Sequence, residues 1–175
     1  MKIQVFDIFL ETVNETDAEF ILSLRSDEKR KRFLSPTDSS VEKQRNWIKD
    51  YKTRESKNEE FYFKAIDKNG ISFGLYRIYK INTGMPEVGS WITKPGYHNT
   101  KNPIKLDIGV KDFVFSELNF YTLQFEVRKQ NTSVIKYHKM FDPQTVNEDE
   151  LNYYFILTAQ NFNKNKDILI KKFKL

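Results

Sequence analysis

The chain has 175 residues, which suits one domain over 1–175 with a substantial core, and 15 Phe and 9 Tyr supply much of its bulk. It contains no cysteine, so disulfides, thiolate metal sites and a cysteine nucleophile are excluded together. The two histidines, His98 and His138, show no metal-ligand spacing, and no metal is expected. Without a signal-peptide pattern or an apolar run long enough for a bilayer, a soluble cytoplasmic protein is expected.

The net charge of +5 arises from 29 basic and 24 acidic residues. The basic residues gather in Lys29–Arg32 and in a lysine-rich stretch near the end of the sequence. No helix-turn-helix, zinc-finger or RNP-type motif accompanies them, so nucleic-acid binding ranks last. A solvated surface explains such runs, and attraction for a small phosphate-bearing molecule is the functional alternative.

The first third of the chain predicts one strand and two helices. Alternation favours a strand over Lys2–Val13, and Thr16 is an N-cap candidate for a helix over Asp17–Arg25 with Glu19 at its third position. A polar break then precedes an amphipathic helix over Val41–Arg54. Its buried side is marked by Trp47, Ile48 and Tyr51.

The middle of the chain predicts a hairpin, a third strand and a helix. Strands over Phe61–Asp67 and Ile71–Ile81 are joined by Lys68-Asn69-Gly70, a strong hairpin signal. A strand over Glu87–Thr93 follows, and then a polar loop to Asn102. Proline at a first helical position predicts a helix over Pro103–Leu118 with Asn102 as its cap.

A strand and a helix near residue 130 carry the most specific pattern. Apolar residues alternate in a strand over Tyr121–Val127, and a helix opens at Asn131. At 3.6 residues per turn, Asn131 and His138 lie on one stripe with Val134 and Ile135, about 10 Å apart along the helix. A long ligand along this helix could contact both. A last strand is expected over Leu151–Thr158, and a short strand or helix over Ala159–Leu175.

The strand followed by N-x-x-V-I-x-x-H-K resembles the strand-5/helix-4 segment of GNAT acyltransferases, above all of members found with amino-sugar biosynthesis. The sequence of Asp17–Arg25 resembles the first helix of GNAT proteins. The resemblance to the family as a whole covers roughly Phe9–Thr158. It implies an α+β fold with a mixed sheet flanked by helices. The sheet would splay between the strands at 87–93 and 121–127, where acyl-CoA enters.

The resemblance assigns roles in moving an acyl group, most simply acetyl, from acetyl-CoA to an amine. Glu87 is the candidate base. The alternative is an exposed carboxylate at the edge of a strand. Alternation along the strand places Glu87 on one face with Gly89 and Trp91. His138 stands where many members carry a tyrosine that acts as general acid, with Tyr137 one step off the stripe. A buried structural histidine is the alternative.

Further positions are implied for the cosubstrate. The backbone of Trp91 and Ile92 would bind pantetheine and the thioester oxygen, and Asn131 would both cap its helix and contact the pantetheine arm. The loop before Pro103 lacks the glycine-rich phosphate motif of the family. The diphosphate is therefore assigned to the helix start and the loop residues Asn99, Thr100, Lys101 and Asn102.

The implied acceptor is a small molecule, a nucleotide-linked amino sugar of surface polysaccharide synthesis, whose diphosphate would meet a basic cluster. That cluster comprises Arg25, Lys29, Arg30 and Arg32. Two alternatives stay open: a protein N-terminal acetyltransferase of the ribosomal-protein type, and a catalytically silent GNAT-like binding protein. No membrane span and no nucleic-acid partner are expected, and a homodimer is compatible with the sequence.

Overall fold

The computed structural model describes residues 1–27 and 40–175, in which eight strands form one mixed sheet. The strand order is β1-β2-β3-β4-β5-β6-β8-β7, and β5–β6 is its parallel pair. The strands are β1 (Lys2–Val5), β2 (Ile8–Thr12), β3 (Phe61–Ile66), β4 (Ser72–Tyr79), β5 (Glu87–Thr93), β6 (Thr122–Arg128), β7 (Gln144–Glu148) and β8 (Asn152–Thr158). The expected α+β architecture with a mixed sheet is confirmed.

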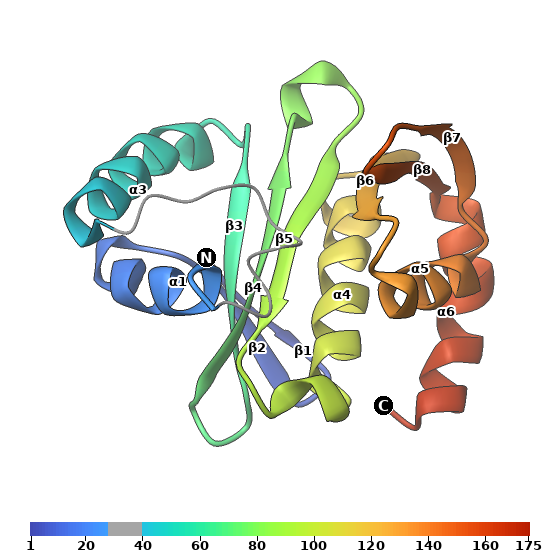
Figure 1. Cartoon of the computed structure of the whole chain (residues 1–175), viewed down its shortest axis with the longest axis horizontal. Helices are drawn as coiled ribbons and strands as arrows, with labels where there is room; N and C mark the ends of the chain where they lie inside the picture. Colours follow the sequence, from blue (N-terminus) through green and yellow to red (C-terminus); the bar gives the residue numbers. More distant parts are fainter. Residues whose placement is uncertain (28–39) are drawn as a thin grey trace.

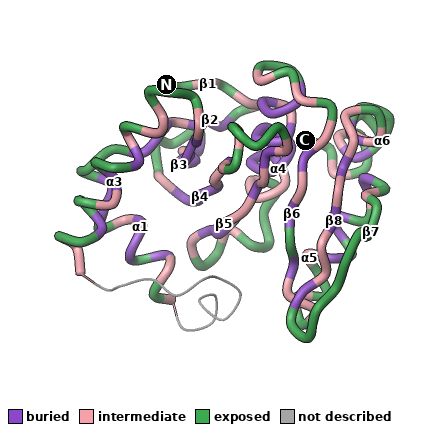
Figure 2. Tube along the Cα trace, turned by 90° about the horizontal axis from the view of Figure 1, so that it is seen from above, coloured by how far each residue is buried: buried purple, intermediate pink, exposed green. Residues whose placement is uncertain are grey.

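Helices cover both faces of this sheet (Figure 1). The α-helices are α1 (Ala18–Arg25), α3 (Val41–Ser56), α4 (Asn102–Asp112), α5 (Thr132–His138) and α6 (Ala159–Phe173). A π-helical turn, Phe113–Glu117, extends α4. Helices α1 and α3 close a smaller core around Ile48 and Tyr51, whereas α4, α5 and α6 share the larger core on the other face. Figure 2 shows the buried positions concentrated along the strands and the inner sides of the helices.

The N-terminal strand prediction is wrong in one respect, because a hairpin divides the segment. Strands β1 and β2 pair with each other, and the chain reverses at Phe6, whose φ is 54°. Neither Gly nor Asn marks this reversal, so the turn signal is missing from the sequence. The helical cap was also misplaced. Asn14, not Thr16, accepts from the backbone and forms a capping box with Asp17.

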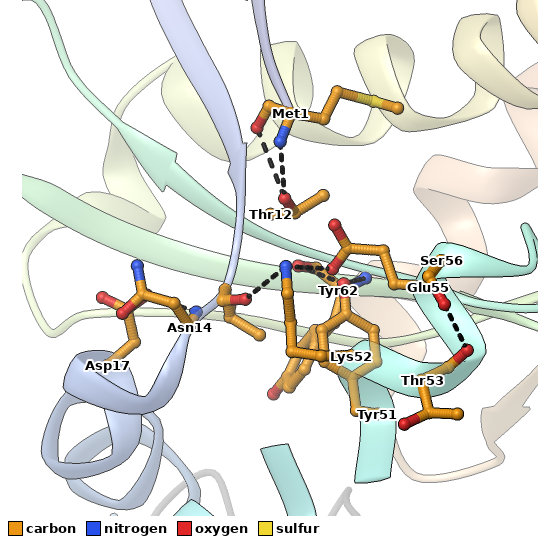
Figure 3. A network of polar contacts seen from close by, with 11 residues as sticks. Met1, Thr12, Asn14, Asp17, Tyr51, Lys52, Thr53, Glu55, Ser56 and Tyr62 are labelled. Atoms are coloured by element: carbon orange, nitrogen blue, oxygen red, sulfur yellow. Dashed lines mark hydrogen bonds and ion pairs between the residues drawn. The ribbon is translucent and has the colours of Figure 1, made fainter. Parts of the chain in front are cut away.

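Helix α3 is fastened to the sheet by a polar network around Lys52 and Tyr51 (Figure 3). Lys52 Nζ donates to the Val13 carbonyl at 3.5 Å and pairs with Glu55 at 2.7 Å. The Tyr51 hydroxyl accepts from the Tyr62 amide at 2.9 Å. The predicted buried side of this helix is confirmed, because Ile48 and Tyr51 are fully enclosed.

The predicted hairpin between β3 and β4 is confirmed, with Gly70 at φ 80° and Asp67 Oδ1 accepting from the amides of Asn69 and Ile71. Strand β5 has the predicted bounds. Two elements near the end of the chain were not predicted as such. Strand β7 is exposed at all five positions, so it lacks the alternation of a half-buried strand. The segment left open as strand or helix is the amphipathic α6.

In the described part of the chain, no helix has the length and apolar character that a membrane crossing requires.

Candidate functional site

A cleft of about 670 Å³ opens where β5 and β6 part. The two strands share one pairing, Glu87 with Gln124, supported by a bond from the Gln124 amide to the Pro86 carbonyl at 2.9 Å. Beyond that point the strands diverge, and α5 and the start of α4 complete the walls. The lining residues include Ser90, Trp91, Thr93, His98, Thr100, Pro103, Glu126, Asn131, Tyr137, His138 and Phe173.

A bulge in β5 decides which side chains face which layer. Ser90 has φ 56°, and the β4–β5 register shifts opposite it. As a result Val88 and Trp91 pack in the core shared with α4, whereas Ile92 packs in the core under α1 and α3. The prediction that Glu87, Gly89 and Trp91 share a face is therefore wrong, because the extra residue reverses the alternation.

The same strand presents backbone donors to the cleft. Lys94 N donates to Phe73 O at 2.7 Å across β4, and Ile92 stands opposite Leu75 in the same register. Since hydrogen-bonding direction alternates along a strand, the amides of Trp91 and Thr93 point to the opposite edge, which is the cleft. The amide of Ile92 is directed at β4. Of the two backbone positions expected to bind pantetheine, Trp91 directs its amide to the cleft and Ile92 does not, whereas the amide of Thr93 also faces the cleft.

Helix α5 forms the second wall. Asn131 is its N-cap residue as predicted, yet its side chain makes no capping hydrogen bond and instead accepts from Ser133 Oγ at 3.4 Å. Asn131, Val134 and His138 line the cleft, whereas Ile135, the fourth member of the predicted stripe, does not. Within the described residues, the buried Trp91 Nε1 has no hydrogen-bond acceptor.

Behind the cleft wall lies a buried polar network that the sequence reading missed. Asp107 accepts from Tyr76 at 2.8 Å, from Tyr137 at 2.7 Å and from Lys111 Nζ at 2.7 Å. Lys111 also contacts His138 Nδ1 at 3.0 Å. Asp107 and Lys111 are both fully buried. The network therefore joins β4, α4 and α5 at the back of the cleft.

These contacts set the charge of His138. Burial, and next the positive charge of Lys111, lower the pKa of His138 to about 3. The imidazole is accordingly neutral at neutral pH, and the expected imidazolium general acid is not the form that this surrounding favours. Tyr137, the alternative acid, gives its hydroxyl hydrogen to Asp107, and burial raises its pKa well above the usual value.

Two carboxylates lie near the junction of β5 and β6. Glu87 accepts from the Tyr79 hydroxyl and pairs with Lys80 Nζ at 2.6 Å, and it does not line the cleft. Glu126, which the sequence reading did not single out, does line it. Burial, and next the charge of Glu87, raise the pKa of Glu126. Glu126 occupies a polar position of an alternating strand, as Gln124 does, so no local signal in the sequence distinguishes it.

The start of α4 differs from the prediction by one residue, because α4 begins at Asn102 and Lys101 occupies the N-cap position. Of the four loop residues proposed for the diphosphate, Thr100 lines the main cleft. Asn99, Lys101 and Asn102 do not, and Thr100 and Asn102 border a smaller neighbouring cavity of about 380 Å³. Lys101 Nζ donates to the Lys174 carbonyl at 2.6 Å, and this contact bridges the start of α4 and the end of α6.

The candidate acceptor side adjoins the bulge. Arg25, at the end of α1, donates to Ser90 Oγ at 3.2 Å, which places its guanidinium beside the cleft. The other members of the predicted basic cluster, Lys29, Arg30 and Arg32, lie outside the described residues. Over residues 1–27 and 40–175, no group of three or more His, Cys, Asp or Glu side chains is arranged to hold a metal ion.

Comparison with known proteins gives these features a context. Residues 7–141 match the family model described as "Acetyltransferase (GNAT) domain". A search among curated proteins found no match. A solved structure described as "Apo FdhC- a nucleotide-linked sugar GNAT" is 31% identical, with a TM-score of 0.84 and coverage of 97% of this chain and 96% of that one.

Two further solved structures share the fold at lower identity. Spermidine N-acetyltransferase from Vibrio cholerae, in complex with CoA and spermine, has a TM-score of 0.76 and 16% identity, covering 90% of this chain and 98% of that one. Ribosomal-protein-S5-alanine acetyltransferase from Vibrio fischeri has a TM-score of 0.77 and 12% identity, with coverages of 93% and 98%.

Proposed function

The chain belongs to the GNAT family of acetyl-CoA-dependent N-acetyltransferases, and from that premise we propose that its acceptor is the primary amine of a nucleotide-linked amino sugar. The observation that carries the proposal is the full-length likeness, at 31% identity, to a chain described as a nucleotide-linked sugar GNAT. The other similar structures are far less identical and support only the fold.

The cleft suits the thioester cosubstrate. An extended pantetheine arm can lie in the gap between β5 and β6 and accept from the amides of Trp91 and Thr93, as an added strand would. The thioester carbonyl would then be polarised by one of these fixed amides, because backbone donors need no reorganisation when negative charge develops. Asn131 and His138 line the opposite wall and would contact the arm from α5.

The acceptor would approach from the face that carries Ser90 and Arg25. The Arg25 guanidinium beside the cleft would meet a phosphate oxygen of the nucleotide through charge-assisted hydrogen bonds. A carboxylate at the β5–β6 junction would take the ammonium proton before attack, directly or through a water molecule. A free amino sugar lacks the diphosphate and should be a far poorer substrate.

The test measures CoA release with UDP- and dTDP-linked amino sugars, the corresponding free sugars, spermidine and peptides with varied N-termini. Turnover of a nucleotide-linked sugar, at least tenfold above that of its free sugar in kcat/KM, is expected. Arg25→Gln should lower that kcat/KM, and Arg45→Gln, at an exposed arginine of α3, is the matched control. Turnover of peptides without turnover of sugar nucleotides would overturn the proposal in favour of a protein N-terminal acetyltransferase. An absence of turnover with any amine would favour a silent binding protein.

A further inference from the structure

Lys111 is a fully buried ammonium that the reaction described above does not use. Its Nζ donates to Asp107 Oδ2 at 2.7 Å, contacts His138 Nδ1 at 3.0 Å, and lies 4.3 Å from the centre of the Phe141 ring. Taking a lysine out of water costs free energy, and a single buried carboxylate offsets much of that cost.

The contact with Lys111 fixes the tautomer of His138. An ammonium group has donors only, so Nδ1 must be the acceptor of that hydrogen bond. A neutral imidazole whose Nδ1 accepts carries its hydrogen on Nε2. The ring is held in place by Phe125, at 4.6 Å between centroids, and by Trp91, at 5.5 Å. His138 lines the cleft, so Nε2–H, on the side of the ring away from Lys111, is its donor toward a bound thioester.

We propose that Lys111 supplies, through His138, the proton that the departing CoA thiolate takes up. The inference rests on the proposed acyl transfer, and it makes Lys111 a positioning residue and proton source behind a neutral histidine. When the tetrahedral intermediate collapses, the C–S bond breaks and its electron pair goes to sulfur. The sulfur takes the Nε2 proton of His138, and His138 Nδ1 takes a proton from the Lys111 ammonium.

The step balances in charge and protons. Lys111 ends as a neutral amine beside the Asp107 carboxylate, and His138 ends as the Nδ1–H tautomer, neutral before and after. The proton that the acceptor amine loses goes to solvent through the base. After CoA-SH leaves, His138 Nε2 regains a proton from solvent and Nδ1 returns its own to Lys111. The imidazole therefore never has to become a cation in a buried site.

The surroundings of His138 suit such a relay. The titratable and charged groups that face it are Asp107 and Lys111 from α4, Tyr76 from β4 and Tyr137 from α5. Both tyrosines donate to Asp107, so they hold the carboxylate that retains the lysine. Burial lowers the pKa of Lys111, and the negative charge of Asp107 offsets part of that effect. The lowered pKa makes the lysine proton easier to give up.

The first test is nitrogen NMR of the ¹⁵N-histidine-labelled wild-type chain, in which the ring nitrogens of only two histidines have to be assigned. His138 should show a protonated Nε2 and an unprotonated Nδ1 throughout pH 5.5–8, and the exposed His98 gives a second set of ring-nitrogen signals for comparison. A His138 that carries its hydrogen on Nδ1, or that becomes cationic in this range, overturns the proposal. This readout requires no acceptor, so it stands even if the acceptor is not a sugar nucleotide.

The second test is the paired variant Asp107→Asn/Lys111→Gln, which removes both charges together so that neither is left buried alone. Acetyl-CoA should still bind, and the single-turnover rate of acyl transfer should fall by roughly 10- to 100-fold. The wild-type rate should decline at alkaline pH because Lys111 then lacks the proton it supplies, and this decline should be absent from the pH profile of the variant. Asp112→Asn/Lys166→Gln removes a partly exposed ion pair that joins the end of α4 to α6, and it is the matched control. Wild-type turnover with an unchanged pH profile in the first variant overturns the proposal. If that variant does not fold, the wild-type NMR result decides.

Discussion

Glu87 and Glu126 lie on adjoining strands close to the last point where β5 and β6 pair, but their surroundings differ. Each Glu87 oxygen already accepts one hydrogen bond, one from Tyr79 and one from Lys80. Glu126 lines the cleft, and burial together with the charge of Glu87 raises its pKa toward that of a useful base. We therefore expect Glu126, rather than Glu87, to meet the acceptor amine.

We expect Glu126→Gln to lower kcat by about tenfold or more, and Glu87→Gln to lower it less, while acetyl-CoA affinity changes little in both. The loss should shrink as pH rises, because more of the acceptor amine is then unprotonated. Steady-state kinetics of both variants between pH 6.5 and 9 measure this. A larger loss in Glu87→Gln than in Glu126→Gln would return the base to Glu87, where the sequence pattern first placed it.

His138 also links stability to pH. Its pKa is about 3 in the folded chain, against about 6.5 when unfolded. Between these values the unfolded chain binds one more proton than the folded chain does. The free energy of unfolding should therefore fall by about 1.4 kcal/mol for each unit that pH drops below 6.5. Above pH 6.5, His138 should not make the free energy of unfolding depend on pH.

Urea unfolding of the wild type and of His138→Gln at pH 7.5, 6 and 5 measures this slope. Between pH 6 and 5, the free energy of unfolding should fall less steeply for His138→Gln than for the wild type, by about 1.4 kcal/mol per pH unit. His98→Gln, at an exposed position, should leave the decline unchanged. Parallel curves for wild type and His138→Gln would show that His138 is protonated alike in both states.

At the scale of elements, α4 packs against β1, β2, β4 and β5, and its Gly109 lies against Val5 of β1. A Cβ at Gly109 would lie 2.6 Å from Val5 Cγ1 and 3.1 Å from Val5 Cβ. Gly109→Ala should therefore lower the free energy of unfolding by roughly 1–2 kcal/mol, because overpacking outweighs the helix preference of alanine. Thermal or urea unfolding measures it.

The matched control for Gly109→Ala is a double variant. Adding Val5→Ala removes both γ-methyl groups that the new Cβ would meet, so Gly109→Ala should cost less in that background, with a coupling of about 1 kcal/mol. If the two changes are simply additive, the crowding lies elsewhere along the helix.

Most elements could be predicted from the sequence because they have a local signal, which β7 lacks. Asn69-Gly70 marks the β3–β4 hairpin, and the apolar period of 41–54 marks α3. The Phe6 reversal and the Ser90 bulge have no such signal, since neither residue type favours a positive φ. The bulge matters most for function, because it decides that Trp91 and Glu87 face different layers.

The buried pair behind the cleft escaped prediction for a different reason. Asp107 and Lys111 are four residues apart, which in a helix is the ordinary spacing of a solvent-exposed ion pair. In the structure every residue from Lys105 to Lys111 is buried, including these two charged side chains. Because charged residues stand among the apolar ones in this helix, no local pattern in the sequence marks it as buried on all sides.

At the scale of the whole molecule, the last helix returns to the cleft that the middle of the chain builds. Phe173 of α6 lines the cleft, and its ring lies 6.5 Å from that of Tyr137. The bond from Lys101 to the Lys174 carbonyl joins the same helix end to the start of α4. The wall near the proposed diphosphate position thus depends on residues far apart in sequence.

We expect Phe173→Ala to weaken acetyl-CoA binding by about tenfold, because an apolar wall of the cleft is lost. A thermal-shift titration with acetyl-CoA measures it, since stabilisation depends on ligand concentration relative to Kd. Ile168→Ala on the exposed side of α6 is the control and should bind as the wild type does. Equal affinity in the two variants would remove Phe173 from the binding surface.

The single pairing between β5 and β6 means that the sheet of the free protein is two half-sheets held at one backbone position. A bound pantetheine arm would add hydrogen bonds in the gap between β5 and β6, so that the two half-sheets would form one cooperative unit. In amide hydrogen exchange, Trp91 and Thr93 should exchange quickly in the free chain and slow down with acetyl-CoA, whereas Ile92 and Lys94, directed at β4, should be protected in both states. The cosubstrate would then be a structural component of the sheet for as long as it stays bound.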